Sequence, residues 1–142
     1  MKYKLWLVLI LSSLALISCS SGDDPTRNEN PQTEETRYYV KYEAYMPLGF
    51  SSQITSRKIT YTTEKGEQNI STSTANWEGT YGPFKKNTKV YLKVEAESGG
   101  IRTDAEYYVR LYVSREKEPF VIKGEQRLKE TSQLYTEYTI DF

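Results

Sequence analysis

Residues 89–97 read KVYLKVEAE, and the pattern of this stretch decides the fold. Every second position is apolar, and lysine, tyrosine and glutamate stand between. The apolar positions are Val90, Leu92, Val94 and Ala96. Side chains of a β-strand point alternately to the two faces of a sheet, so a period of two predicts a strand with one face in the core and one in water. The serine and two glycines at 98–100 then predict a break.

The same alternation recurs along the chain from residue 36 onward. It predicts six further strands, at 38–46, 58–63, 68–73, 107–113, 120–123 and 134–142. No stretch has sustained apolar spacing of three and four residues, so we expect essentially no helix beyond the N-terminal segment. About seven short strands separated by turn residues predict an all-β domain, an antiparallel β-sandwich of the immunoglobulin-like kind, over residues 36–142.

Residues 1–18 are typical of a lipoprotein signal peptide. Lys2 and Lys4 precede an apolar run, 5–17, that is too short to cross a bilayer, which takes about 20 apolar residues. The tetrapeptide LISC at 16–19 resembles the bacterial lipobox, whose cysteine is acylated before the signal peptide is removed. The resemblance implies lipidation of Cys19, with a further acyl chain added in diderm bacteria. An ordinary secretory peptide with a chance cysteine is the alternative.

Cys19 is the single cysteine of the 142-residue chain. A lone thiol in an exported protein needs an explanation, and lipidation supplies one. One acyl chain holds a protein at a membrane only marginally, whereas two or more hold it stably. We therefore expect the membrane to be a partner through the lipid on Cys19, and we expect the core to hold the fold without a disulfide.

Residues 19–35 form the lipidated cysteine and an acidic linker. The segment 20–35 contains five acidic residues, one arginine and no aliphatic or aromatic side chain, which predicts a flexible tether. Its first part, SSGDD at 20–24, resembles the acidic export signal of surface lipoproteins of the Bacteroidota. That resemblance implies an outer-membrane protein at the cell surface. The alternatives are a generic linker and a location on the periplasmic face.

Composition excludes several chemistries. Residues 36–142 carry sixteen basic and fourteen acidic residues, far from the basic excess of a nucleic-acid binder. The chain has no histidine, which excludes histidine-dependent nucleophiles and histidine zinc sites. Acidic residues flank the 98–100 break and could serve glycoside hydrolysis, but their alternation places them mainly on solvent faces. We expect no catalytic residue, no metal and no cofactor.

Several motifs support a family resemblance. An ITYT strand, a tryptophan, the segment YGPFKK, a strand VYLKV and the strand end LYVS follow one another, at 59–62, 77, 81–86, 90–94 and 111–114. Their order resembles small lipoproteins of the Bacteroidota and the β-sandwich domain of the mycobacterial MmpS membrane proteins. The chain has a lipobox where MmpS proteins have a transmembrane helix, so no transport partner is carried over.

Outward-facing aromatic residues give the candidate binding site. If Val90 and Leu111 face the core, then Tyr91 on one strand and Tyr108, Arg110 and Tyr112 on another face outward. A hairpin through 99–100 would merge these residues into one surface. Tyrosine beside arginine is common at protein interfaces, and aromatic rings also stack on sugars. Cross-strand packing of the tyrosines is the alternative.

From these features we expect a membrane-anchored, non-catalytic binding module with a protein or glycan partner. A glycan-binding accessory lipoprotein of a surface uptake system is the second hypothesis, and an enzyme is the third.

Overall fold

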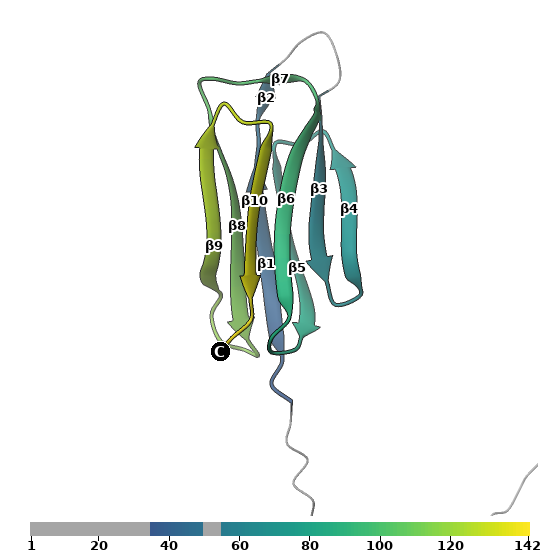
Figure 1. Cartoon of the computed structure of the whole chain (residues 1–142), viewed down its shortest axis with the longest axis vertical. Helices are drawn as coiled ribbons and strands as arrows, with labels where there is room; N and C mark the ends of the chain where they lie inside the picture. The colour runs from purple at the N-terminus through teal and green to yellow at the C-terminus, as the bar shows by residue number, and fades with distance from the viewer. Residues whose placement is uncertain (1–34, 50–54) are drawn as a thin grey trace, which may run out of the picture. The chain divides into compact units, whose positions relative to one another are not determined.

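The computed structural model describes residues 35–49 and 55–142 (Figure 1). These residues belong to one compact unit that spans residues 33–142. The expected signal peptide, Cys19 and nearly all of the expected tether lie outside the described residues. None of the described residues forms a helix, and hence no helix in this part is long and apolar enough to cross a membrane.

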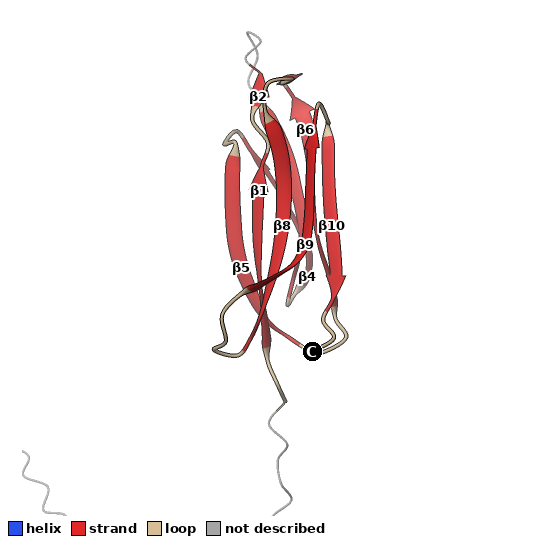
Figure 2. Ribbon diagram, turned by 90° about the vertical axis from the view of Figure 1, so that its left-hand side faces the viewer, coloured by secondary structure: helices blue, strands red, loops and turns tan. Residues whose placement is uncertain are grey.

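The described part is all-β and contains ten strands (Figure 2). They are β1 (Tyr38–Tyr45), β2 (Leu48–Gly49), β3 (Ser56–Thr63), β4 (Gly66–Thr72), β5 (Asn76–Phe84), β6 (Lys89–Ser98), β7 (Gly100–Ile101), β8 (Glu106–Arg115), β9 (Val121–Lys129) and β10 (Gln133–Thr139). Eight are long, while β2 and β7 form a two-residue ladder. The sequence prediction of an all-β sandwich is confirmed.

Two antiparallel four-stranded sheets make the sandwich. Sheet A has the order β5-β1-β8-β9, and sheet C has the order β10-β6-β3-β4. In an immunoglobulin-like sandwich, strands G, F, C and C′ lie in this order in one sheet, while B and E are neighbours in the other. The strands β10, β6, β3 and β4 of sheet C correspond to G, F, C and C′, and the neighbours β1 and β5 of sheet A correspond to B and E. The difference lies in the hairpin β8–β9. It precedes β10, which has the position of strand G, in the sequence. Within its sheet, β8 lies beside β1, in the position that strand A has in an immunoglobulin domain.

The core fills the space between the two sheets. The inward side chains of β1, β6 and β8 are the alternate apolar positions of the sequence, among them Val40, Val90, Leu92, Val94, Val109 and Leu111, all with no exposed surface. Burial of these side chains removes apolar surface from water, which stabilises the fold by about 25 cal/mol per Å² of surface buried. For these six residues, the burial predicted from the period of two is correct.

Two sequence predictions about the strands are wrong. β6 and β8 do not pair as a hairpin: β6 pairs with β3 and β10, and β8 pairs with β1 and β9. The chain crosses from one sheet to the other at this point, and Gly100–Ile101 pairs with β2. The strand β5 is absent from the prediction because Gly79, Gly82 and Pro83 interrupt its alternation of Trp77 and Tyr81 with polar residues.

Candidate functional site

The structure separates the four residues of the predicted site. Tyr91 lies on the outer face of sheet C, whereas Tyr108, Arg110 and Tyr112 lie on the outer face of sheet A. The expected outward orientation is correct for all four, and each is partly exposed. The expected merging of their surfaces is wrong, because the two strands belong to different sheets.

Three of the four residues belong to one surface on sheet A, the tyrosine–arginine face. We define it as Lys41, Glu43, Tyr45, Tyr108, Arg110, Tyr112, Glu125 and Arg127. Cross-strand register brings these residues together, since Glu43 lies opposite Arg110 and Arg110 lies opposite Glu125. The face thus draws one or more residues from each of β1, β8 and β9.

Tyr108 is the aromatic centre of the tyrosine–arginine face. Its ring lies 5.5 Å from that of its cross-strand partner Tyr45. The guanidinium of Arg110 stacks on it at 4.4 Å from the ring centroid, and that of Arg127 lies at 5.3 Å. Such cation–π contacts contribute about 0.5–1 kcal/mol at exposed sites. The ring is therefore held in place before any partner arrives.

Ion pairs complete the tyrosine–arginine face. Nε of Arg110 lies 2.8 Å from Glu125, which also accepts from Nε of Arg127 at 2.7 Å. Glu43 lies 2.7 Å from Nζ of Lys41 and accepts a hydrogen bond from the Tyr112 hydroxyl at 2.8 Å. Arg110 bridges the two carboxylates, since Nη1 lies 3.7 Å from Glu43.

The pKa values on this face follow from those contacts. Partial burial raises the pKa of Glu43, but hydrogen bonds from Lys41 and Tyr112 and the nearby cations outweigh it, so the net shift is downward. The pKa of Tyr112 is raised by burial and by its hydrogen bond to the Glu43 carboxylate. The pKa of Arg110 is raised by its hydrogen bond to Glu125. The shifts of Glu43 and Arg110 both favour the charged form of the side chain.

Tyr91 has a separate environment on sheet C. Its hydroxyl donates to the carboxylate of Glu67, and its ring lies 6.0 Å from that of Tyr135. Burial, and then the contact with Glu67, raises the pKa of Tyr91 to about 12. Tyr91 therefore packs across strands, as the alternative interpretation of the sequence expects, and it cannot assist Tyr108 at a common site.

An aromatic cluster that the sequence did not predict lies where β5 faces β3. The ring of Tyr61 lies 4.8 Å from that of Trp77 and 4.9 Å from that of Tyr81. Tyr61 is buried, while Trp77 and Tyr81 are partly exposed. Phe84, at the end of β5, is buried, and Trp77 is partly buried against the core. Recognition of β5 as a strand would have placed Trp77 and Tyr81 on one face.

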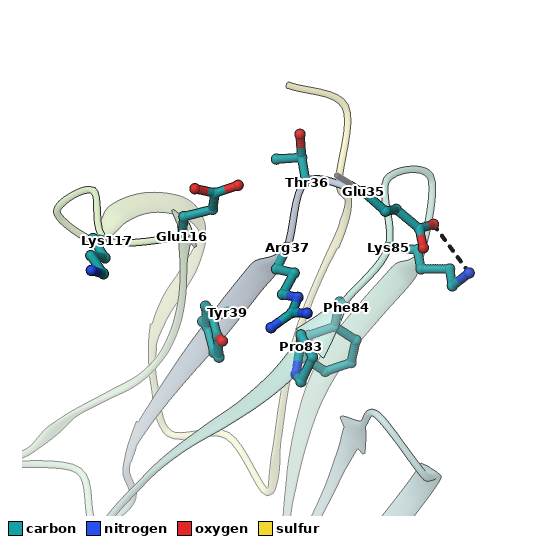
Figure 3. Close-up of a pocket in the computed structure, with 9 residues that line it drawn as sticks. All are labelled: Glu35, Thr36, Arg37, Tyr39, Pro83, Phe84, Lys85, Glu116 and Lys117. Carbon is teal, nitrogen blue, oxygen red and sulfur yellow. Dashed lines mark ion pairs between the residues drawn. The ribbon is translucent and has the colours of Figure 1, made fainter. Parts of the chain in front are cut away.

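A cavity of about 540 Å³ lies where the chain enters β1 (Figure 3). Arg37 extends into it between Tyr39 and Pro83, and Phe84 forms its floor. Lys85, at its rim, pairs with Glu35 at 3.1 Å. The volume lies in the range of small-molecule sites, about 300–1,000 Å³. No sequence pattern predicts this cavity, because its residues come from three distant segments.

No cluster of three or more potential metal ligands occurs within residues 35–49 and 55–142. Comparisons with protein-family models, with curated proteins and with solved structures found no match.

Proposed function

We propose that the chain is a membrane-anchored, non-catalytic extracytoplasmic lipoprotein that acts as a binding module for a protein at the cell surface. The lipobox-like segment before Cys19 supports the anchor. The tyrosine–arginine face of sheet A is the observation that carries the binding role. It supplies three of the four residues that the sequence singled out: Tyr108, Arg110 and Tyr112.

The chemistry of this face suits a protein partner. Tyrosine and arginine are enriched at the centres of protein interfaces, where they contribute much of the binding energy. Here Tyr108 and Arg110 already stack on each other, and Arg110 is held by Glu125. Binding then loses little side-chain entropy, which otherwise weakens association by about 0.5–1.5 kcal/mol for each immobilised side chain.

The test replaces Tyr108 and Tyr112 by serine in the mature chain. We expect at least about tenfold weaker binding to intact cells, since removal of a central tyrosine commonly costs more than 1 kcal/mol. The matched control replaces Tyr91 and Tyr135, the tyrosine pair of the opposite sheet, and should bind as wild type. Equal losses of binding in both variants, or no loss in either, would contradict the proposal. Thermal melting of each variant identifies a loss that comes from unfolding.

A glycan-binding accessory role in a surface uptake system is the second candidate. The observation that favours it is the cluster of Trp77, Tyr61 and Tyr81, whose two outer members are partly exposed. Binding on a glycan array that disappears with Trp77→Ala and persists in the Tyr108 and Tyr112 variant would select this function over the first.

The anchor has its own test. Cys19→Ala should move the protein from the membrane fraction to the soluble fraction, because no acyl chain can be attached. A variant that still partitions with membranes would contradict the lipoprotein assignment. Protease treatment of intact cells then distinguishes the cell surface from the periplasmic face, since only a surface protein is digested.

A further inference from the structure

Four cations without a carboxylate partner gather at one end of the sandwich, the end at which the chain enters β1. We call it the proximal end. The cations are Arg37, Lys86, Arg115 and Lys117, all exposed, and none of them forms an ion pair with another described residue. By contrast, five cations on the outer faces of the two sheets are paired: Lys41, Lys89, Lys93, Arg110 and Arg127. The proximal end therefore has positive charge available for a ligand.

Exposed apolar side chains lie beside these cations. Phe120 is 41% exposed, Val121 51% and Ile122 46%, three of the five large apolar residues exposed in the described part. They follow the loop that carries Lys117, at the start of β9 (Figure 1). Phe120 also lines a shallow depression together with Tyr39 and Lys117. Val121 lies opposite the inward Val113 and Ile122 opposite the outward Tyr112, so Phe120, beside Lys117, is the apolar residue that belongs with these cations.

The position of Cys19 in the sequence identifies the ligand. Fifteen residues, 20–34, separate Cys19 from Glu35 at the proximal end. A flexible tether of that length, which the composition of residues 20–35 predicts, would span about 20 Å on average. If Cys19 is acylated, the proximal end is the part of the domain held nearest to the lipid headgroups. Apolar side chains next to lysine and arginine are the combination that binds anionic membrane surfaces.

We propose that the proximal end is a lipid-docking surface, which binds the phosphates of the membrane that holds Cys19. Arg37 and Lys117 would contact headgroup phosphates while Phe120, beside Lys117, enters the interface. The proposal rests on the anchoring half of the proposed function. Docking at this end would fix the orientation of the domain, with both outer faces upright and the tyrosine–arginine face open to a partner.

Acidic residues near the proximal end weaken its long-range attraction for anions. Glu116 and Glu118 lie in the same loop as Lys117, and Glu35 is neutralised by Lys85. With Lys85 this end has five cations, against four carboxylates once Asp141, next to Phe142, is counted. So small a surplus gives only weak long-range attraction, and binding requires contact of the phosphates with Arg37 and Lys117 and of lipid with Phe120.

The experiment measures co-sedimentation of the mature chain with lipid vesicles. Residues 19–142 are used with Cys19→Ser, because removal of 1–18 deletes none of the described strands. Vesicles of phosphatidylcholine alone are compared with vesicles that also contain phosphatidylglycerol. We expect binding to the anionic vesicles only. It should weaken at high salt, since the attraction of exposed charges is screened.

Two variants test the named residues, each with a matched control. Neutralising Arg37 and Lys117 to glutamine should weaken vesicle binding about tenfold or more, as each cation near a membrane contributes about fivefold. Lys58→Gln with Lys129→Gln, exposed cations outside this end, should have no effect. Phe120→Ser should weaken binding, whereas Leu128→Ser should not; Leu128 is 42% exposed at the far end of the same strand.

Three outcomes would overturn the proposal. One is the absence of binding to anionic vesicles, and the second is equal loss in test and control variants. The third is binding to a soluble polyanion such as heparin without binding to vesicles, which would make the end an acidic-glycan site. The vesicle assay uses unacylated protein, so its failure is independent of the fractionation test of Cys19.

Discussion

The hydroxyl of Tyr112, on β8, donates a 2.8 Å hydrogen bond to the carboxylate of Glu43, on β1. The same carboxylate pairs with Lys41 at 2.7 Å and lies 3.7 Å from Arg110. Glu43 thus joins two strands through three polar partners, and its side chain is only 21% exposed. It is the acceptor that holds Tyr112 and Arg110 in place on the tyrosine–arginine face.

We expect Glu43→Gln to lower the free energy of unfolding by about 1 kcal/mol at neutral pH, because it removes charge-assisted hydrogen bonds. The pKa of Glu43 is lower in the folded chain. Its contribution is therefore complete above the unfolded pKa, about 4.3, and is lost as the pH falls through the folded pKa. Urea denaturation between pH 7 and pH 3 measures this. Glu78→Gln is the control, since Glu78 is 75% exposed; a difference that persists at low pH would contradict the prediction.

Arg57 is a buried cation on β3 whose side chain forms hydrogen bonds to two loops. Its side chain donates from Nε to the carbonyl of Met46 and from Nη1 to that of Ser73 at 2.8 Å, and the residue is 3% exposed. We expect Arg57→Ala to cost about 2–4 kcal/mol, because both carbonyls lose their donor. Arg57→Lys should recover little, since an ammonium lacks the fork geometry. Lys58→Ala is the exposed control. Wild-type stability of Arg57→Lys in thermal unfolding would refute this account.

Gly82 has a backbone conformation that favours glycine, with φ of +139°. A Cβ there would lie 2.8 Å from the carbonyl oxygen of Tyr38 and 2.9 Å from the ring of Tyr39. We expect Gly82→Ala to destabilise the fold by about 2 kcal/mol. Gly100→Ala is the control, since a Cβ at Gly100 meets no atom within 4 Å. Chemical denaturation compares the two, and equal stabilities would show that β5 can shift at no cost.

The two sheets approach closely at Gly124. A Cβ on Gly124, in β9, would lie 2.4 Å from Oγ1 of Thr136, in β10. We expect Gly124→Ala to destabilise the domain by about 1–3 kcal/mol through overpacking. Adding Thr136→Ala removes the clashing hydroxyl and should recover part of that loss. A double-mutant cycle measures the coupling, and strict additivity of the two changes would mean that the sheets separate there without contact.

The sequence predicted which side chains face the core and which face water. Val90 and Leu111 point inward and Tyr91 and Tyr108 point outward because successive residues of a strand alternate between faces, a property of the local backbone alone. Strand pairing involves residues distant in sequence. The alternation within each strand was compatible with a hairpin between residues 89–97 and 107–113, but it does not determine which strands pair.

β5 shows where periodicity fails. Its inward residues, Trp77, Gly79 and Tyr81, alternate with polar ones, but glycine and proline interrupt the apolar signal. The ring of Tyr81 lies over Gly79, where a Cβ would come within 2.8 Å of it. The space that glycine leaves is filled by a neighbouring side chain, so the strand is stabilised by packing that the sequence pattern does not reveal.

The sequence alone predicts the all-β class, the buried face of strands with regular alternation such as β6 and β8, and the acylation of Cys19. The tertiary structure alone decided which outward residues share a surface. It placed Tyr91 and Tyr108 in different sheets, joined Glu43 to Tyr112, and gathered Arg37, Lys117 and Phe120 at the proximal end. The physical reason is that alternation is fixed by the geometry of one strand, whereas neighbours across strands are fixed by how two whole sheets bury their apolar faces together.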